Sequence, residues 1–289
     1  MSDAAPSVEV LIPVYNHERF VAGCLESVRQ LDYRPLRVGI IDDGSSDASA
    51  RTVEDWLAAH PDLAARATFQ SRPNRGLAAT LNELVARSSG DLLVLLASDD
   101  RLLPDGIAPR VKALQAHPDW LAVFADCQVI GLDGRVLAKS SVAWYGGRPR
   151  ALASRKLIAA EMMRQWSAAG PGIMLRRAAF DPRLGVGPYD ENLQAEDVDL
   201  YLRLLARHAL GFIPNVVAQY RWQPDALKGQ RWKDIAAENH AVRAGHARAF
   251  TGLEGLAVRA YWRRDEAYAR LRETPPGAGR GRLARLAAW

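Results

Sequence analysis

Two adjacent carboxylates, Asp99 and Asp100, follow an unbroken apolar segment from Leu92 to Ala97. A short apolar run closed by charge is typical of a strand that is buried on both faces of a sheet. Neighbouring carboxylates repel each other unless a cation lies beside them, and a hard divalent ion with oxygen ligands would serve. Asp is also favoured at a helix N-cap, and Pro104 could open a following helix. The pair indicates either a metal site or a helix start.

Polar residues also follow three other predicted strands. We expect these strands at Val8 to Pro13, Leu36 to Ile41 and Ala67 to Ser71. Each is followed by apolar residues at helical spacing, and strand-helix repeats favour right-handed crossovers in a parallel sheet. All four strands then end at one rim, where open α/β sheets bind ligands. The rim would carry Pro13, Tyr15, Asn16, Asp42, Asp43, Asn74, Arg75, Gly76 and the Asp99-Asp100 pair.

A second acidic pair, Glu196-Asp197, lies near the start of a helix predicted within Glu191 to His208. Acids in a first helical turn stabilise the helix dipole, which is one interpretation. The other is that they have a functional role.

The elements that must position these residues indicate an α/β fold with a Rossmann-like, mostly parallel central sheet flanked by helices. The first strand is not followed by G-x-G-x-x-G, and the sequence contains no G-x-x-x-x-G-K-[ST]. The dinucleotide fingerprint and the P-loop are therefore excluded. The Gly-rich, aromatic segment Ser140 to Pro149 is expected to be a long loop near the rim, of the kind that often forms a lid. Its Trp144 is a candidate for stacking on a sugar, although core filling is the commoner fate of Trp.

The composition is that of a soluble globular protein. The 289 residues are 48% apolar, yet no run of apolar residues is long enough to span a bilayer. Because the N-terminus has no secretory signature, we expect a cytoplasmic protein. Cys24 and Cys127 lie in apolar patterns and are expected to be buried free thiols. The six histidines lack metal-ligand spacing and are interpreted as structural or solvated.

The positive charge is concentrated at the C-terminal end. From 221 to 289 there are fourteen Arg or Lys and seven Asp or Glu, a surplus of +7, so the first 220 residues carry −2 of the total of +5. This predicts a basic helical C-terminal extension, 221–289, with an anionic partner. Leu283, Leu286 and Trp289 are spaced along a last short helix, which would either contact a membrane surface or dock on its own domain. No nucleic-acid-binding module is visible.

Five motifs in a fixed order resemble the inverting family 2 glycosyltransferases of the GT-A fold. They are LIPVYN, DDGSSD, NRGLAATLN, ASDD with a following aliphatic-Pro segment, and EDVDLYLRL, and they span about Val8 to Tyr220. The resemblance implies a GT-A domain over 1–220, with a nucleotide-sugar-binding half (1–104) and an acceptor half (105–220).

The resemblance assigns roles to individual residues. Asp43 would accept a hydrogen bond from the base, and a uracil N–H is a donor that a carboxylate can recognise, which favours a UDP-sugar. Arg75 would support the base or the phosphates. Asp100 would coordinate Mn or Mg bridging the diphosphate, although Ala97 stands where the family's usual motif has its first acid. The implied nucleotide contacts are Pro13, Tyr15, Asn16, Glu18, Asp43, Arg75, Gly76 and, at the ribose, Asp99.

Asp197 matches the catalytic base of the family. The implied reaction is a single displacement, in which the base takes a proton from an acceptor hydroxyl that attacks the anomeric carbon. Glu196 would orient the base or the acceptor. The expected activity is sugar transfer to a glycan or lipid-linked acceptor in cell-surface polysaccharide synthesis, in the cytoplasm or on the inner face of the membrane.

Two other functions are compatible with parts of the sequence. A sugar nucleotidyltransferase would need a basic, Gly-rich loop after the first strand, and this loop is absent. A non-catalytic GT-A scaffold is conceivable because the first acid is missing, but both Asp99-Asp100 and Asp197 are retained.

Overall fold

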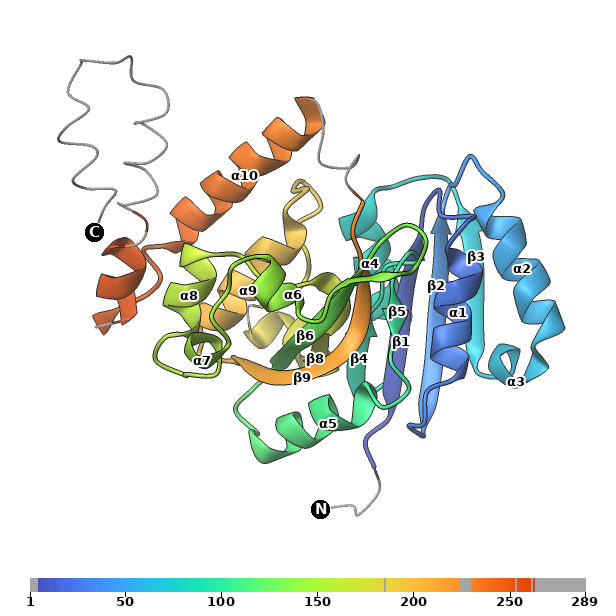
Figure 1. The fold of residues 1–289 in the computed structure, drawn as a ribbon, viewed down its shortest axis with the longest axis horizontal. Helices are drawn as coiled ribbons and strands as arrows, with labels where there is room; N and C mark the ends of the chain where they lie inside the picture. Colours follow the sequence, from blue (N-terminus) through green and yellow to red (C-terminus); the bar gives the residue numbers. More distant parts are fainter. Residues whose placement is uncertain (1–4, 185, 224–229, 253, 261, 263–289) are drawn as a thin grey trace.

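A nine-stranded sheet forms the centre of the molecule, with helices on both faces (Figure 1). The strand order is β3-β2-β1-β4-β8-β6-β9-β5, and β7 pairs with β6. In the computed structural model the described residues are 5–184, 186–223, 230–252, 254–260 and 262. Within them, no helix is both long and apolar enough to cross a bilayer.

The first half of the chain forms the predicted parallel strand-helix repeats. Its strands pair in parallel in the order β3-β2-β1-β4. The elements are β1 (Val8–Val14), α1 (Val21–Arg29), β2 (Leu36–Asp43), α2 (Ser49–Ala59), α3 (Pro61–Ala64), β3 (Ala67–Arg72), α4 (Leu77–Arg87) and β4 (Leu92–Leu95). The four carboxyl ends therefore share one edge, as expected.

Alternating side chains explain why β1 is buried on both faces. Val10 and Ile12 belong to the core that contains Cys24 of α1, whereas Leu11 packs with Leu84 of α4 on the opposite face. This alternation follows from the two-residue period of a strand. Both cysteines are free and buried, which confirms their predicted state.

The second half of the sheet is mixed. Here β8 (Ile173–Arg176) runs antiparallel to β4 and to β6 (Ala122–Ile130), whereas β9 (Leu210–Arg221) is parallel to β6. The short strands β5 (Arg101–Leu102) and β7 (Val136–Ala138) are also antiparallel to their neighbours. The parallel direction predicted from strand-helix repeats therefore holds for β1 to β4, where a helix returns the chain each time.

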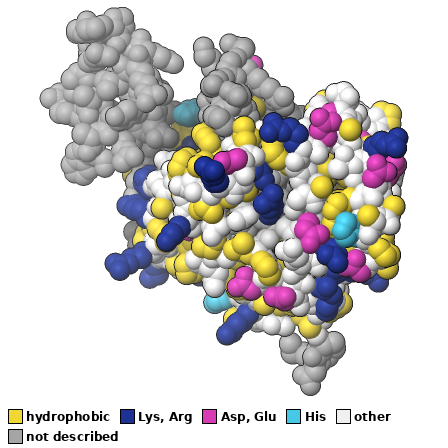
Figure 2. All heavy atoms as spheres, turned by 45° about the vertical axis from the view of Figure 1, so that its right-hand side comes forward, with side chains coloured by type: hydrophobic (Ala, Val, Ile, Leu, Met, Phe, Trp, Pro, Cys, Tyr) yellow, Lys and Arg dark blue, Asp and Glu magenta, His cyan; other side chains and the backbone are white. Residues whose placement is uncertain are grey.

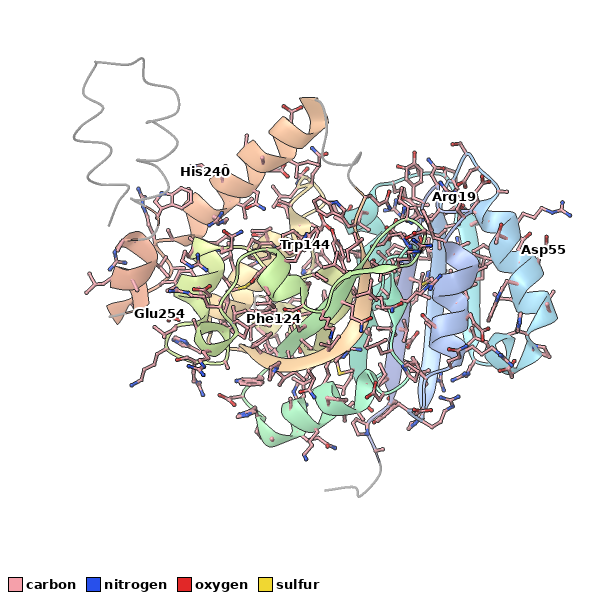
Figure 3. All side chains as sticks on the ribbon, in the orientation of Figure 1. Arg19, Asp55, Phe124, Trp144, His240 and Glu254 are labelled. Atoms are coloured by element: carbon pink, nitrogen blue, oxygen red, sulfur yellow. The ribbon has the colours of Figure 1, made fainter. Side chains whose placement is uncertain are left out.

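Helices cover this second half on both sides. They are α5 (Ile107–Ala116), α6 (Ser141–Trp144), α7 (Pro149–Leu152), α8 (Ile158–Arg164), α9 (Glu196–Ala206) and α10 (Gln230–His246), with 3-10 turns at Gly170–Gly172, Arg177–Phe180 and Pro182–Leu184. Phe124 of β6 points into the core, whereas Asp55 of α2 points outward (Figure 3). On the face drawn in Figure 2, acidic and basic side chains are interspersed.

The segment Ser140 to Pro149 is not the uninterrupted loop that the sequence predicts. It contains α6, whose N-cap Ser140 accepts a hydrogen bond from the Ala143 N–H (3.0 Å) and donates one to Asp126 (2.5 Å). Val142 is buried beneath the turn. Capping and one apolar anchor thus make a helical turn that the irregular spacing did not reveal.

Candidate functional site

A pocket of about 460 Å³ lies at the shared edge, between the ends of β1, β2 and β4 and the start of α4. Four of the predicted nucleotide contacts line it, together with residues that follow β4. The lining is Pro13, Val14, Tyr15, His17, Asp43, Asn74, Gly76, Leu77, Thr80, Ala97 and Ser98. The pocket thus lies where the sequence predicts a ligand site, at the carboxyl ends of the parallel strands.

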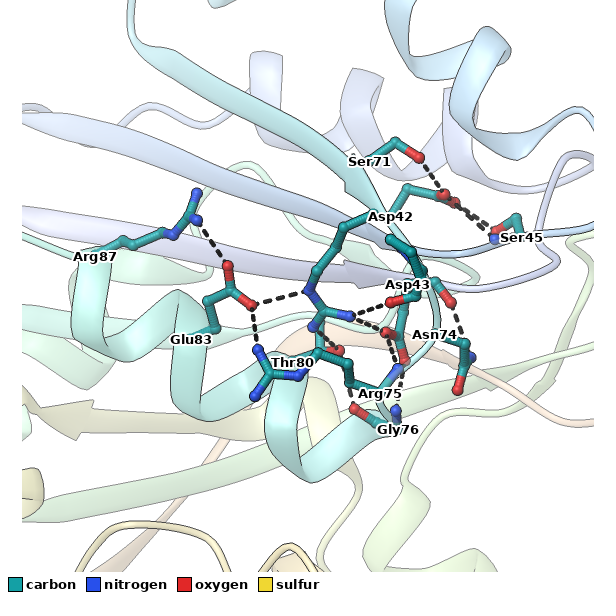
Figure 4. Close-up of polar contacts among 12 residues, drawn as sticks. Asp42, Asp43, Ser45, Ser71, Asn74, Arg75, Gly76, Thr80, Glu83 and Arg87 are labelled. Carbon is teal, nitrogen blue, oxygen red and sulfur yellow. Dashed lines mark hydrogen bonds and ion pairs between the residues drawn. The ribbon is translucent and has the colours of Figure 1, made fainter.

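Asp43 is buried and fixes the loop that leads into α4 (Figure 4). Its carboxylate accepts hydrogen bonds from the N–H groups of Arg75 (2.8 Å) and Gly76 (3.0 Å) and from the guanidinium of Arg72. A carboxylate has about four acceptor positions, so one remains for a ligand donor. Gly44, with φ +70°, is required beside it, because a Cβ there would lie 2.6 Å from the Asn74 nitrogen.

Arg72 is a site residue that the sequence analysis missed. Its side chain is 9% exposed and also donates to Glu83 (2.9 Å) and Thr80 (2.8 Å). Arg75, which was predicted to support the base or phosphates, has a side chain that is 56% exposed and lies 3.5 Å from Glu83. The signal for Arg72 was its position as the last residue of β3, at the shared edge.

Asn16 and Glu18 lie behind the pocket and hold the turn between β2 and α2. Asn16 has φ +53°, and its side-chain oxygen accepts from the Ser46 N–H (2.8 Å). Glu18 accepts from the Ala48 N–H (2.9 Å) at the start of α2. Neither is among the residues that line the pocket. In this structure the two side chains stabilise the turn beside the pocket instead of lining the pocket.

Asp99 and Asp100 are both buried in the turn after β4, with exposures of 8% and 2%. Asp100 accepts from the main-chain N–H of Arg221 (2.7 Å), and Asp99 accepts from the amide of Gln223 (2.5 Å). The guanidinium of Arg221 donates to the carbonyls of Asp99 (2.7 Å) and Gly131 (2.6 Å). Burial, reinforced by the charge of Asp99, raises the pKa of Asp100 well above its usual range. Two buried carboxylates side by side offer hard oxygen ligands of the kind that a divalent cation prefers.

Arg221 and Gln223 were counted with the basic tail, and their place beside the carboxylates was not predicted. Arg221 is the last residue of β9, is 3% exposed, and lies over the ring of Phe20. It is therefore part of the sheet rather than of a basic surface.

His17, interpreted as structural or solvated, lies at the pocket wall. Its Nδ1 is 2.8 Å from the Ser98 hydroxyl and 3.9 Å from an Asp99 oxygen. It thereby links the segment after β1 to the segment after β4.

The second acidic pair begins α9, as predicted. Asp197 accepts from the Val198 N–H (2.7 Å), and burial raises its pKa. Burial first, and the charge of Asp197 second, raise the pKa of Glu196 to about 8. The Tyr189 hydroxyl is buried near both acids and has no hydrogen-bond partner among the described residues. Apolar surroundings thus favour the protonated form of one acid at neutral pH.

Glu196 lines a second pocket of about 290 Å³, beside the first. Both pockets are lined by Gly76 and Leu77, at the start of α4. Arg75 lines the second pocket and not the first. The structure therefore brings the strand-end residues and Glu196 to adjacent hollows with a common wall.

Aromatic side chains gather near the end of β9. Trp144, labelled in Figure 3, is 41% exposed. It makes an edge contact with Trp222, with ring centres 6.0 Å apart. Tyr145 makes edge contacts with Tyr220 and Trp222 at 6.2 and 6.4 Å. The candidate stacking residue Trp144 thus has an exposed edge in a cluster that adjoins Arg221.

The predicted terminal helix with Leu283, Leu286 and Trp289 lies outside the described residues. Of the extension, α10 packs against α9.

Comparisons with known proteins agree with this geometry. The model of a family described as "Glycosyl transferase family 2" matches residues 9–181. The chain is 25% identical over 227 residues to the "Putative glycosyltransferase EpsE" of Bacillus subtilis, covering 78% of this chain and 77% of that protein. It is 35% identical over 133 residues to the chondroitin synthase of Escherichia coli, covering 46% of this chain but 19% of that protein.

Two solved structures share the fold. Residues 1–349 of S. aureus TarS, in complex with UDP-GlcNAc, match with a TM-score of 0.62 and 16% identity, over 94% of this chain and 74% of that one. The mannosyltransferase PcManGT from Pyrobaculum calidifontis, in complex with GDP-Man and Mn2+, matches with a TM-score of 0.59 and 21% identity, over 99% and 86%. These likenesses confirm the predicted GT-A fold.

Proposed function

The chain belongs to glycosyl transferase family 2, and we propose that it moves a sugar from a UDP-linked donor to an acceptor hydroxyl with inversion at the anomeric carbon. The family match confirms the predicted resemblance and identifies a sugar-transferring enzyme. One observation carries the proposal. The strand-end pocket and the pocket lined by Glu196 share Gly76 and Leu77, so a donor in the first would lie next to an acceptor in the second.

In this proposal the donor's base binds against Asp43. The fourth acceptor position of its carboxylate would take the N–H of a uracil, because the other three are used within the protein. TarS has been solved with UDP and UDP-GlcNAc, which supports a UDP donor, whereas PcManGT was solved with GDP-Man. Pro13, Tyr15 and Gly76 would complete the nucleotide contacts.

The Asp99-Asp100 pair fits a divalent metal, Mn or Mg. The buried Asp100 carboxylate supplies hard oxygen ligands, and PcManGT was solved with Mn2+. The described residues contain no group of three or more metal-ligating side chains, so diphosphate and water oxygens would complete the shell. The bound ion would offset charge on the leaving diphosphate. Asp100 would be the ligand, and Asp99 would contact the ribose.

Asp197 acts as the base in the proposed mechanism. Burial and the charge of Asp197 raise the pKa of Glu196, which favours Glu196 as the protonated member of the pair and leaves Asp197 as the candidate base. Asp197 takes the acceptor's proton while the hydroxyl oxygen bonds to the anomeric carbon. The bond from that carbon to the diphosphate breaks, and the nucleoside diphosphate leaves with the bonding electrons. Glu196 orients the acceptor.

The acceptor is a glycan or lipid-linked hydroxyl in cell-surface polysaccharide synthesis. Support comes from the similarity to chondroitin synthase. The enzyme would act in the cytoplasm or peripherally on the inner face of the membrane, with contact through its basic tail. In this proposal residues 1–104 bind the donor and 105–220 the acceptor.

Calorimetry tests the donor assignment. We expect UDP to bind in the presence of Mn, and we expect chelator or Asp100→Ala to weaken that binding, because each removes the cation beside the diphosphate. Asp55→Ala, on the outward face of α2, is the matched control. Binding of GDP or TDP without UDP would contradict the donor assignment. Failure to bind any nucleotide would contradict the function.

A further inference from the structure

The helix α10 contacts the start of α9 through hydrogen bonds that are long-range in sequence. Glu238 Oε2 accepts from the main-chain N–H groups of Gln194 (2.7 Å) and Ala195 (2.8 Å). These residues immediately precede Glu196 and Asp197. Further along α10, His246 Nε2 lies 2.8 Å from an oxygen of Asp199.

The N-terminus of α9 has no side-chain cap of its own. Its N-cap residue is Ala195, which has no side-chain acceptor. The first N–H groups of a helix, and those just before it, need partners from outside the helical bonds. Glu238 supplies a charged acceptor at this point, and hydrogen bonds to an ionised carboxylate are stronger than neutral ones.

The same helix also borders the pocket that Glu196 lines. Ile235, three residues before Glu238, is among the lining residues, with Leu193 and Gln194. Figure 1 shows α10 lying along α9. The extension is therefore in contact with both the backbone that precedes the acidic pair and the pocket that Glu196 lines.

We propose that Glu238 is a positioning residue, which holds the backbone before α9 so that Glu196 and Asp197 face the donor. This rests on the proposed function, because that function makes Asp197 the base. Glu238 does not touch the reacting atoms. It acts through two main-chain bonds, and displacement of a catalytic group by about 1 Å can cost about a hundredfold in rate.

The carboxylate also acts through its charge. Burial and Asp197 are the main causes of the raised pKa of Glu196, and the negative charge of Glu238 raises it further. Replacing Glu238 by Gln keeps an oxygen acceptor but removes this charge. The two effects can therefore be separated by comparing Glu238→Ala with Glu238→Gln.

Hydrogen–deuterium exchange tests the contact without turnover. In the full chain, Glu238→Ala is expected to speed exchange of the Gln194 and Ala195 amides at least about tenfold, while Glu238→Gln keeps most of the protection. His246→Ala is the matched control, because it removes a bond between the same two helices without touching these amides. Unchanged exchange in Glu238→Ala would overturn the inference and leave the proposed function standing.

Kinetics test the consequence, using UDP release from UDP-GlcNAc as the probe. We expect Glu238→Ala to lower kcat about ten- to a hundredfold with the donor KM within about twofold, since only the acidic pair is displaced. Glu238→Gln should recover most of kcat. It should also move the alkaline limb of the pH profile of kcat to lower pH, because it removes a negative charge that raises the pKa of Glu196. A parental kcat in Glu238→Ala, or an equal loss in His246→Ala, would overturn the positioning role.

Discussion

The two ends of the proposed site, the donor end at Asp43 and the catalytic end at Glu196 and Asp197, are built in different ways. At the donor end, Asp43 is fixed by donors from residues 72–76, all within the first four strands. At the catalytic end, the backbone before Glu196 is held by Glu238, more than forty residues further along the chain. The first arrangement joins residues within the strand-helix repeats and leaves one acceptor position of Asp43 open, whereas the second keeps two acids with raised pKa values in place through a distant helix. Under the proposed function, donor binding would use contacts made within the first half of the chain, and reactivity would depend on the extension.

Replacement of Asp197 by Asn is expected to have the largest effect. Loss of a general base lowers kcat by about 10²- to 10⁴-fold, whereas the donor end is untouched and UDP should bind as in the parent. Transfer rates and calorimetry on the same preparation check this. Glu196→Gln should cost less, and transfer at the parental rate by Asp197→Asn would remove Asp197 as the base.

Replacement of Arg72 by Ala should destabilise the donor end by about 3–5 kcal/mol, because it leaves the buried Asp43 carboxylate without its cation, whereas Glu83 keeps its ion pair with Arg87. Arg75→Ala is the paired control and should change the free energy of unfolding by less than about 0.5 kcal/mol, since that side chain is more than half exposed. Urea denaturation measures both. Equal changes in the free energy of unfolding for the two variants would show that the ion pair between Arg72 and Asp43 does not stabilise the donor end.

The catalytic end should also be visible in the pH dependence of stability. The pKa of Glu196 is raised from 4.5 to about 8, so the folded chain binds an extra proton between these values. Its contribution to stability is full below pH 4.5 and decreases as the pH rises to 8, with a slope of up to about 1.4 kcal/mol per pH unit. Glu196→Gln should flatten this part of the curve. If the free energy of unfolding of Glu196→Gln decreased with pH as steeply as that of the parent, Glu196 would not be buried in its protonated form.

Deletion of 274–289 should have the smallest effect on both ends. These residues lie outside the described part of the chain, and their basic composition predicts contact with anionic lipid. We expect weaker cosedimentation with anionic vesicles and donor hydrolysis close to that of the full chain. Unchanged cosedimentation would contradict the membrane contact.

The sequence was most informative where neighbours in space are also neighbours in the strand-helix repeat. The first four strands, their shared rim and the pocket residues Pro13, Tyr15, Asp43 and Gly76 followed from strand ends alone. The antiparallel strands could not be predicted in this way, because β8 pairs with β4 across eighty residues without a repeating signal.

Partners that are remote in sequence also escaped prediction. Arg221 and Gln223 reach the Asp99-Asp100 pair from the end of β9, and Glu238 reaches α9 from the extension. Composition assigned all three to a basic C-terminal extension, and charge counting carries no information about which of its residues are buried. Whether a charged residue binds its own domain is decided by tertiary packing.

The hydrogen bond from the Arg221 N–H to Asp100 has a consequence for synthesis of the chain. Chains emerge from the ribosome N-terminus first, and domains fold as they become available. The strands that form the nucleotide pocket emerge first, but Asp100 receives its main-chain partner only when β9 has been made. The carboxylate pair after β4 is thus synthesised more than a hundred residues before the backbone that partners Asp100.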